Sequence, residues 1–223
     1  MKPLPSFLRH ASLPSLIGCL LLSAFQPVSP PKRVENGYLR VEAEAYQRQE
    51  KDSLRRWYQV DADHSPSELA DPDSSHASSA SGGAYLEILP DTRTTHDDAL
   101  IKGENFINSP GAMAILHYEV EVPAPGRYFI WVRAFSTGTE DNGIHVGLDG
   151  AWPESGQRMQ WCAGKHQWTW ESKQRTQEQH CGVERLIYLD IEEAGTHTIS
   201  FSMREDGFEF DAWVMEQAYV RPE

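Results

Sequence analysis

The stretch SMREDGFEFDAWVM, from Ser202 to Met215, lies close to the end of the 223-residue chain. Its second half is typical of a β-strand, because aromatic and β-branched residues dominate it. Asp211 nevertheless stands between Phe210 and Trp213, in the most apolar part of the stretch. An ionised carboxylate among aromatic side chains is costly unless it is paired or bound to a metal. The stretch therefore predicts a terminal strand that carries a partnered acid.

Short strands of the same kind recur along the chain. YLRVEAEAY, starting at Tyr38, alternates apolar and charged residues with a period of two. Two further strands are expected at Ala114–Val122 and Arg127–Phe135, joined by PAPG, and a hairpin is expected at 184–203, with EEAG at its bend. The 16 Gly and 14 Pro punctuate these segments, and we find no long amphipathic helical pattern. We predict an all-β fold, a two-sheet antiparallel β-sandwich of the jelly-roll type.

Composition limits the partners of this fold. The chain is long enough for one domain with a sizeable core, and its formal net charge is −13. A phosphate backbone is repelled by such a charge, so nucleic acid is excluded as a partner. A highly charged acidic polymer is also a poor ligand unless a local basic patch or a bound cation helps. We expect a monomer.

The first 30 residues have the profile of a secretory signal peptide. Lys2 and Arg9 precede an apolar stretch from Leu13 to Phe25, and no acidic residue interrupts it. A Pro-rich linker, 31–37, and a sandwich domain, 38–220, are expected to follow. LIGC also resembles a lipobox, which offers Cys19 as a lipidation site. We expect a secreted or periplasmic protein; the alternative is an outer-membrane lipoprotein, attached to the membrane only through Cys19.

Removal of the signal peptide changes the cysteine count. Of the three cysteines, Cys162 and Cys181 remain. An even pair in an oxidising compartment predicts one disulfide, which closes a loop of about 20 residues. The alternative is two free buried thiols.

Four motifs in order resemble a known family. They are EAE near the start, LHYEVEVPAPGRYFIWVRA, HVGLDG, and AGTHTISFSMREDGFEFDAWVM. Together they resemble the galactose-binding-like β-sandwich of many carbohydrate-binding modules, and more narrowly the C-terminal domain associated with glycoside hydrolase family 115. The likeness spans Tyr38 to about Tyr219. It implies a non-catalytic protein that recognises a polysaccharide.

The resemblance also implies a structural calcium ion. In such modules the first and last strands are neighbours, and an E-x-E pair and a late aspartate hold the ion, which corresponds here to Glu42, Glu44 and Asp211. Ca²⁺ prefers six to eight oxygen ligands, and residues i and i+2 of a strand face the same side. The alternative is that Asp211 pairs with Arg40 or Arg133, or points to solvent.

Tryptophans gather in one polar segment, 152–182. Flat indoles suit the apolar C–H face of a sugar, and polar side chains around them suit its hydroxyls. The candidates for carbohydrate binding are therefore Trp152, Trp161, Trp168 and Trp170. Trp168 and Trp170 should face the same side of an extended segment. The alternative is that all four pack onto the sandwich.

Two loops supply polar candidates. Asp141 and Asn142 precede a strand, although Asn-Gly is also a strong turn signal. Arg204 and Glu205 stand just before the last strand, where related modules place a sugar-contacting polar residue, which is usually Asn.

Catalytic motifs are sparse. We find no G-x-S-x-G, H-E-x-x-H or P-loop pattern. Two alternatives to a binding module stay open. One is a small jelly-roll polysaccharide lyase or glycoside hydrolase, with His96, His117 or His145 as a possible base. The other is a structural or adhesive module without a sugar site.

Overall fold

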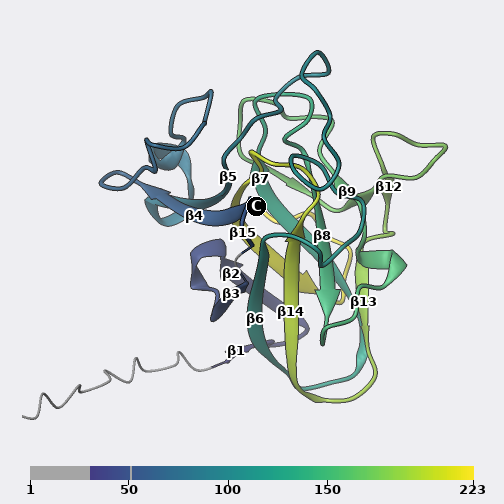
Figure 1. Ribbon diagram of the computed structural model, residues 1–223. Helices are drawn as coiled ribbons and strands as arrows, with labels where there is room; N and C mark the ends of the chain where they lie inside the picture. Colours follow the sequence, from purple (N-terminus) through teal and green to yellow (C-terminus); the bar gives the residue numbers. More distant parts are fainter. Residues whose placement is uncertain (1–30, 51) are drawn as a thin grey trace, which may run out of the picture.

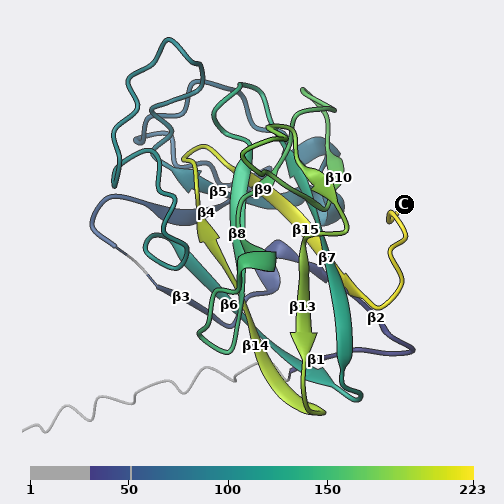
Figure 2. The same ribbon diagram turned by 90° about the vertical axis from the view of Figure 1, so that its right-hand side faces the viewer.

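The computed structural model describes residues 31–50 and 52–223. The predicted signal peptide, its apolar stretch and Cys19 lie outside these ranges. Two β-sheets pack face to face, with long loops gathered at one end of the sandwich, uppermost in Figure 1 and Figure 2. Apart from β1 with β6, the paired strands of the described part are antiparallel. The predicted all-β, two-sheet antiparallel sandwich is confirmed.

The first sheet has the order β1-β6-β14-β8-β9-β11-β12, and β3 also pairs with β6. Its strands are β1 (Lys32–Arg33), β3 (Arg48–Glu50), β6 (Ile115–Val122), β8 (Gly143–Leu148), β9 (Met159–Gln160), β11 (Lys173–Gln174), β12 (Val183–Glu184) and β14 (Gly195–Met203).

The second sheet has the order β10-β7-β15-β5-β4, with β13 on β7 and β2 on β15. Its strands are β2 (Tyr38–Glu42), β4 (Arg56–Asp61), β5 (Ala84–Leu89), β7 (Gly126–Phe135), β10 (Thr169–Glu171), β13 (Tyr188–Ile191) and β15 (Glu209–Glu216). Four short 3₁₀ turns complete the described elements: η1 (Ala43–Ala45), η2 (Ala77–Ser79), η3 (Ser81–Gly83) and η4 (Glu154–Gly156).

The core lies between the sheets and is rich in aromatic side chains. Phe201 from β14 packs edge-on to Tyr118 from β6, and both approach Trp213 from β15. Such pairs add to the free energy gained from apolar burial alone. The Tyr118 hydroxyl donates a hydrogen bond to the Ala43 carbonyl, so it is satisfied although it is fully buried.

One β-bulge explains how an acid fits into the terminal strand. The register of β15 against β7 shifts between Phe210 and Ala212, so Asp211 is the extra residue. With this insertion both Phe210 and Trp213 join the core, whereas strict alternation would have sent them to opposite faces. Ala212 and Val214 instead pack in a small outer cluster.

Two expected features of the chain path are wrong. β13 pairs with β7 and β14 pairs with β6 and β8, so segment 184–203 crosses between the sheets and is not a hairpin. The expected linker also contributes to the fold. β1 pairs in parallel with β6, and Val34 is part of the core.

Within residues 31–50 and 52–223, no helix is long and apolar enough to cross a membrane.

Candidate functional site

Asp211 has a cationic partner. Its carboxylate forms an ion pair with Arg133 of the adjacent strand β7 and accepts a hydrogen bond of 2.7 Å from the Ser81 backbone N–H. Asp211 is fully buried, and burial raises its pKa although the interactions with Arg133 and Ser81 oppose this shift. The interaction with Arg133 corresponds to one of the alternatives that the sequence left open.

The acids of the first strand lie near this pair. β2 pairs with β15, with Glu42 beside Ala212, as the resemblance implied. Within the part of the chain that the structure describes, one carboxylate oxygen of Glu42 and one of Glu44 are buried without a hydrogen-bond partner. Burial, with the nearby charges of Glu42 and Asp211, raises the pKa of Glu44 to about 7. Glu44 lies in η1, beyond the end of β2. In the described residues, Glu42, Glu44 and Asp211 do not form a group in which the carboxylate oxygens all lie within 4.8 Å of one another.

Trp161 belongs to the core. It is 1% exposed, its ring packs edge-on to Phe208 at 5.1 Å, and its Nε1–H donates a hydrogen bond of 3.1 Å to the Thr169 carbonyl. The prediction that Trp161 contacts a sugar is wrong, because the apolar face of its ring is already covered. Trp152 is half-buried and packs over Gly111, where an added Cβ would lie 2.1 Å from its Nε1.

Trp168, just before β10, and Trp170, within it, both line an open hollow of about 350 Å³, and Trp170 is 5% exposed. We call this the tryptophan hollow; it is lined by Arg40, Ser79, Ala80, Ser81, Arg133, Trp168, Trp170 and Glu223. Arg40 lies over Trp170 and Arg133 lies over Trp168, in cation–π contacts of 5.4 and 5.5 Å. The hollow combines indoles with cationic and hydroxyl groups. The role of Trp168 and Trp170 in sugar binding stays a prediction.

Asp141 is occupied by its own loop. Its carboxylate accepts hydrogen bonds from the Ser136 hydroxyl, from the backbone and hydroxyl of Thr137, and from the Gly138 backbone. It is 2% exposed, so it stabilises this turn and offers no free oxygen to a ligand. The prediction of Asp141 as a direct sugar contact is therefore wrong.

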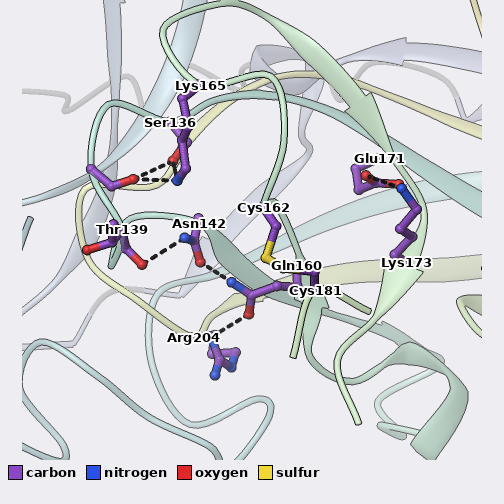
Figure 3. Close-up of a disulfide and its surroundings, with 11 residues drawn as sticks. Ser136, Thr139, Asn142, Gln160, Cys162, Lys165, Glu171, Lys173, Cys181 and Arg204 are labelled. Atoms are coloured by element: carbon purple, nitrogen blue, oxygen red, sulfur yellow. Dashed lines mark hydrogen bonds and ion pairs between the residues drawn. A yellow bond between two sulfur atoms is a disulfide. The ribbon is translucent and has the colours of Figure 1, made fainter. Parts of the chain in front are cut away.

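The other loop candidates form one buried network, and Figure 3 shows its part from Thr139 to Arg204 beside the disulfide. The Asn142 amide donates to the Thr139 carbonyl and accepts from Gln160, whose carbonyl oxygen in turn accepts from Arg204 at 3.3 Å. Glu205 forms an ion pair with Arg204 and accepts from the Asn142 backbone at 3.0 Å. Asn142 and Glu205 are buried beneath the surface; their role is to hold Arg204 in place, and as direct sugar contacts both predictions are wrong.

Arg204 lines a cavity of about 650 Å³. We call it the arginine cavity, and it is lined by Phe106, Asn108, Glu154, Arg158, Gln174, Arg175, Thr176, Gln177, Glu178, His180 and Arg204. These residues come from the loop before β6, from the segment 154–180 and from the turn before β15. The Arg204 guanidinium also lies 5.0 Å from the centre of the Phe106 ring.

Positive charge accumulates in this cavity. Arg204 pairs with Glu205, and Arg158 pairs with Glu154, but in the described part of the chain no acidic side chain lies within ion-pair distance of Arg175. Burial and the charge of Arg204 lower the pKa of Arg175, and burial with the charges of Arg175 and Arg204 lowers the pKa of His180. Glu154 and Glu178 also line the cavity, so its three arginines face two acids, and Arg175 is without an acidic ion-pair partner among the described residues.

The predicted disulfide is present. Cys162 and Cys181 are bonded, with 5.3 Å between their Cα atoms, and they close the loop that carries Gln174 through His180. The bond therefore limits the motion of one wall of the arginine cavity.

Sequence reasoning singled out Arg204 but missed Arg158, Arg175 and His180. The available signal was the polar run KQRTQEQH, which stands directly before the second cysteine. The aromatic pattern of the same segment points to its tryptophans, whereas the convergence of Arg158, Arg175 and Arg204 depends on the fold.

Comparisons with known proteins give one close sequence relative. No family model matches the chain. The chain is 50% identical over 208 residues to the uncharacterised protein P23 of Formosa agariphila, in a match that covers 90% of this chain and 50% of that protein. The chain thus spans half the length of this relative.

Solved structures with a related chain path include carbohydrate-active proteins of different kinds. A Paenibacillus xanthan lyase aligns with a TM-score of 0.43 and 15% identity, over 85% of this chain and 14% of the lyase. A family 35 carbohydrate-binding module from Clostridium thermocellum aligns with a TM-score of 0.42 and 13% identity, over 81% of this chain and 98% of the module. These low scores assign no function to this chain, and the link to glycoside hydrolase family 115 stays a prediction.

Proposed function

We propose that this chain is an exported, non-catalytic carbohydrate-binding protein whose arginine cavity binds an acidic segment of a polysaccharide. The observation that carries the proposal is the convergence of Arg158, Arg175 and Arg204 in one cavity of about 650 Å³. Guanidinium groups form paired, charge-assisted hydrogen bonds with carboxylate or sulfate oxygens. The disulfide is consistent with export.

The remaining lining suits the rest of a sugar. Asn108, Gln174 and Thr176 offer amide and hydroxyl groups for sugar hydroxyls, and Phe106 offers an apolar face. Because Gln174 is held by the carbonyls of Glu154 and Gln157, its position is fixed before a ligand arrives.

Arg175→Ala is expected to weaken binding of an acidic oligosaccharide about 10- to 100-fold, which corresponds to the ~1.5–3 kcal/mol of a hydrogen bond to a charged group. The measurement is isothermal titration calorimetry with oligosaccharides that carry uronate or sulfate groups, beside neutral oligosaccharides of equal length. Affinity for the acidic ligands should also fall as salt concentration rises.

Arg127→Ala is the matched control, because it removes the same charge from an exposed pair with Asp190 on strands β7 and β13. It should bind like the wild type. Equal losses in the two variants, or equal wild-type affinity for neutral and acidic ligands, would contradict the proposal.

A second candidate function is a polysaccharide lyase, and His180 favours it. This imidazole lines the arginine cavity, and its lowered pKa keeps it neutral and able to accept a proton near pH 7. In such a reaction the base removes the proton α to a uronate carboxylate, a neighbouring guanidinium stabilises the resulting negative charge, and the leaving oxygen departs as the double bond forms. Ultraviolet absorbance of the unsaturated product, lost in His180→Ala, would favour the lyase over the binding module.

We further propose a structural calcium ion at Glu42 and Glu44, with Asp211 as the third acid. The two buried carboxylate oxygens without partners support this site. Asp211 would share its carboxylate between the ion and Arg133, because it already pairs with that residue.

Removal of calcium with EDTA is expected to lower the melting temperature of the wild type by several degrees, since an ion that binds only the folded state stabilises it. Glu44→Gln should bind one calcium ion fewer than the wild type and show a smaller response to EDTA. An unchanged calcium stoichiometry in Glu44→Gln would rule out this site.

A further inference from the structure

A second group of acids lies on the outer face of the second sheet, away from the core. Glu87 on β5 stands directly opposite Glu209 on β15 in the antiparallel register, and each is 1% exposed. Like charges at opposed positions of neighbouring strands repel, and burial increases the cost. The fold has therefore placed two carboxylates where they are unfavourable by themselves.

The loop that follows β4 brings further acids to the same place. Asp71, Asp73 and Glu87 each offer an oxygen within 4.8 Å of the others, and Asp73, His76 and Glu209 form an equivalent trio. Asp73 belongs to both trios, so the five side chains make one connected cluster. Ca²⁺–oxygen bonds of about 2.3–2.6 Å put ligands on opposite sides of the ion ~5 Å apart, which matches this spacing.

An independent observation shows that the cluster lacks a partner. One carboxylate oxygen of Glu87 is buried and has no hydrogen-bond partner in the described residues. In the same part of the chain no Lys or Arg lies within ion-pair distance of Asp71, Asp73, Glu87 or Glu209. Buried polar atoms are rarely left unsatisfied, so this oxygen points to a missing ligand.

His76 supports the cluster through Glu209, and the other four side chains of the cluster are carboxylates. Its Nδ1 lies 2.9 Å from both carboxylate oxygens of Glu209, and its ring stacks on Phe135 with 3.6 Å between centroids. An imidazole held in this way orients the Glu209 carboxylate toward a bound ion. The atoms left to bind an ion are carboxylate oxygens, which favours calcium over zinc.

We propose that Asp71, Asp73, Glu87 and Glu209 form a second calcium site, which fastens the loop after β4 to the outer face of the sheet. The metal-free protein is strained at this point: burial and the neighbouring acids raise the pKa of Glu87 to about 10 and that of Glu209 well above its ordinary value. Calcium would compensate the carboxylates and hold the loop residues Asp71 and Asp73 against β5.

The test is calorimetric titration of the full chain with CaCl₂ after removal of metal with EDTA, together with melting temperatures in EDTA and in calcium. Glu87→Gln should bind one calcium ion fewer than the wild type. It should melt several degrees higher than the wild type in EDTA, because it removes a buried carboxyl that the metal-free fold forces to take up a proton, and should lose part of the increase that calcium produces. Replacement of a metal ligand is expected to act in these opposite ways: it raises the melting temperature in EDTA and reduces the increase that calcium produces.

Glu44→Gln serves as the matched variant at the other calcium site and should leave the Glu87 site able to bind. The two calcium proposals can therefore fail separately. If Glu87→Gln does not fold, Asp73→Asn on the half-buried loop tests the same site and should lose the same ion. Equal stabilisation of the variant with and without calcium, at unchanged stoichiometry, would overturn the proposal, and binding of Zn²⁺ or Mn²⁺ without Ca²⁺ would overturn the choice of metal.

Discussion

Trp161→Ala is expected to lower the free energy of unfolding by about 3–5 kcal/mol, as for other large buried aromatic side chains replaced by alanine. For a chain of this size that corresponds to a fall in melting temperature of roughly 6–20 °C. The ring contacts Phe208, which begins the approach to β15, and its N–H satisfies the Thr169 carbonyl at the start of β10. The substitution would leave a cavity and remove this hydrogen bond to the half-buried Thr169.

Trp168→Ala is the matched variant for this prediction. Trp168 is half-buried at the tryptophan hollow. Its ring contacts Tyr85 and Phe135 edge-on and lies beneath the Arg133 guanidinium. Its removal should therefore destabilise the protein less than removal of Trp161. Thermal unfolding followed by near-ultraviolet circular dichroism measures both. A Trp161→Ala variant with a native melting temperature and lost sugar binding would restore Trp161 as a ligand contact.

Loss of the disulfide is expected to have the second large effect. The double variant Cys162→Ser, Cys181→Ser should lose about 3 kcal/mol of stability, the chain-entropy value for a closed loop of this length. Binding of acidic oligosaccharides should weaken as well, because the released loop carries Gln174, Arg175 and His180. Ordering that wall would then have to occur on binding.

Reducing agent provides the control for the disulfide prediction. It should lower the melting temperature and affinity of the wild type and leave the double variant unchanged. Full affinity in the reduced wild type would show that the wall of the arginine cavity is ordered by its own packing.

Several features of this fold could be read from local sequence. The strands expected at Ala114–Val122 and Arg127–Phe135 agree with β6 and β7 to within a residue at each end. Period-two alternation reports which side chains of a strand face the core, and it needs no knowledge of the strand's neighbours. The disulfide was predictable once Cys19 was assigned to the signal peptide, because Cys162 and Cys181 then allow a single pairing.

The acid in the terminal strand was only half predictable. Its burial cost follows from the residues around it, so a partner for Asp211 was expected. The identity of its partner depends on the bulge in β15 and on the position of Arg133 in the neighbouring strand β7. Neither of these can be predicted from the local sequence pattern.

The sequence by itself determined the class of fold, most of the long strands and the one disulfide. The tertiary structure alone decided that β13 and β14 belong to different sheets, that Trp161 is core, that three arginines share a cavity, and that Glu87 faces Glu209. The physical reason is that the two kinds of feature are determined over different distances along the chain. Periodicity is set by the geometry of a single strand, whereas pairing, register and loop contacts are set by the free energy of packing the whole chain.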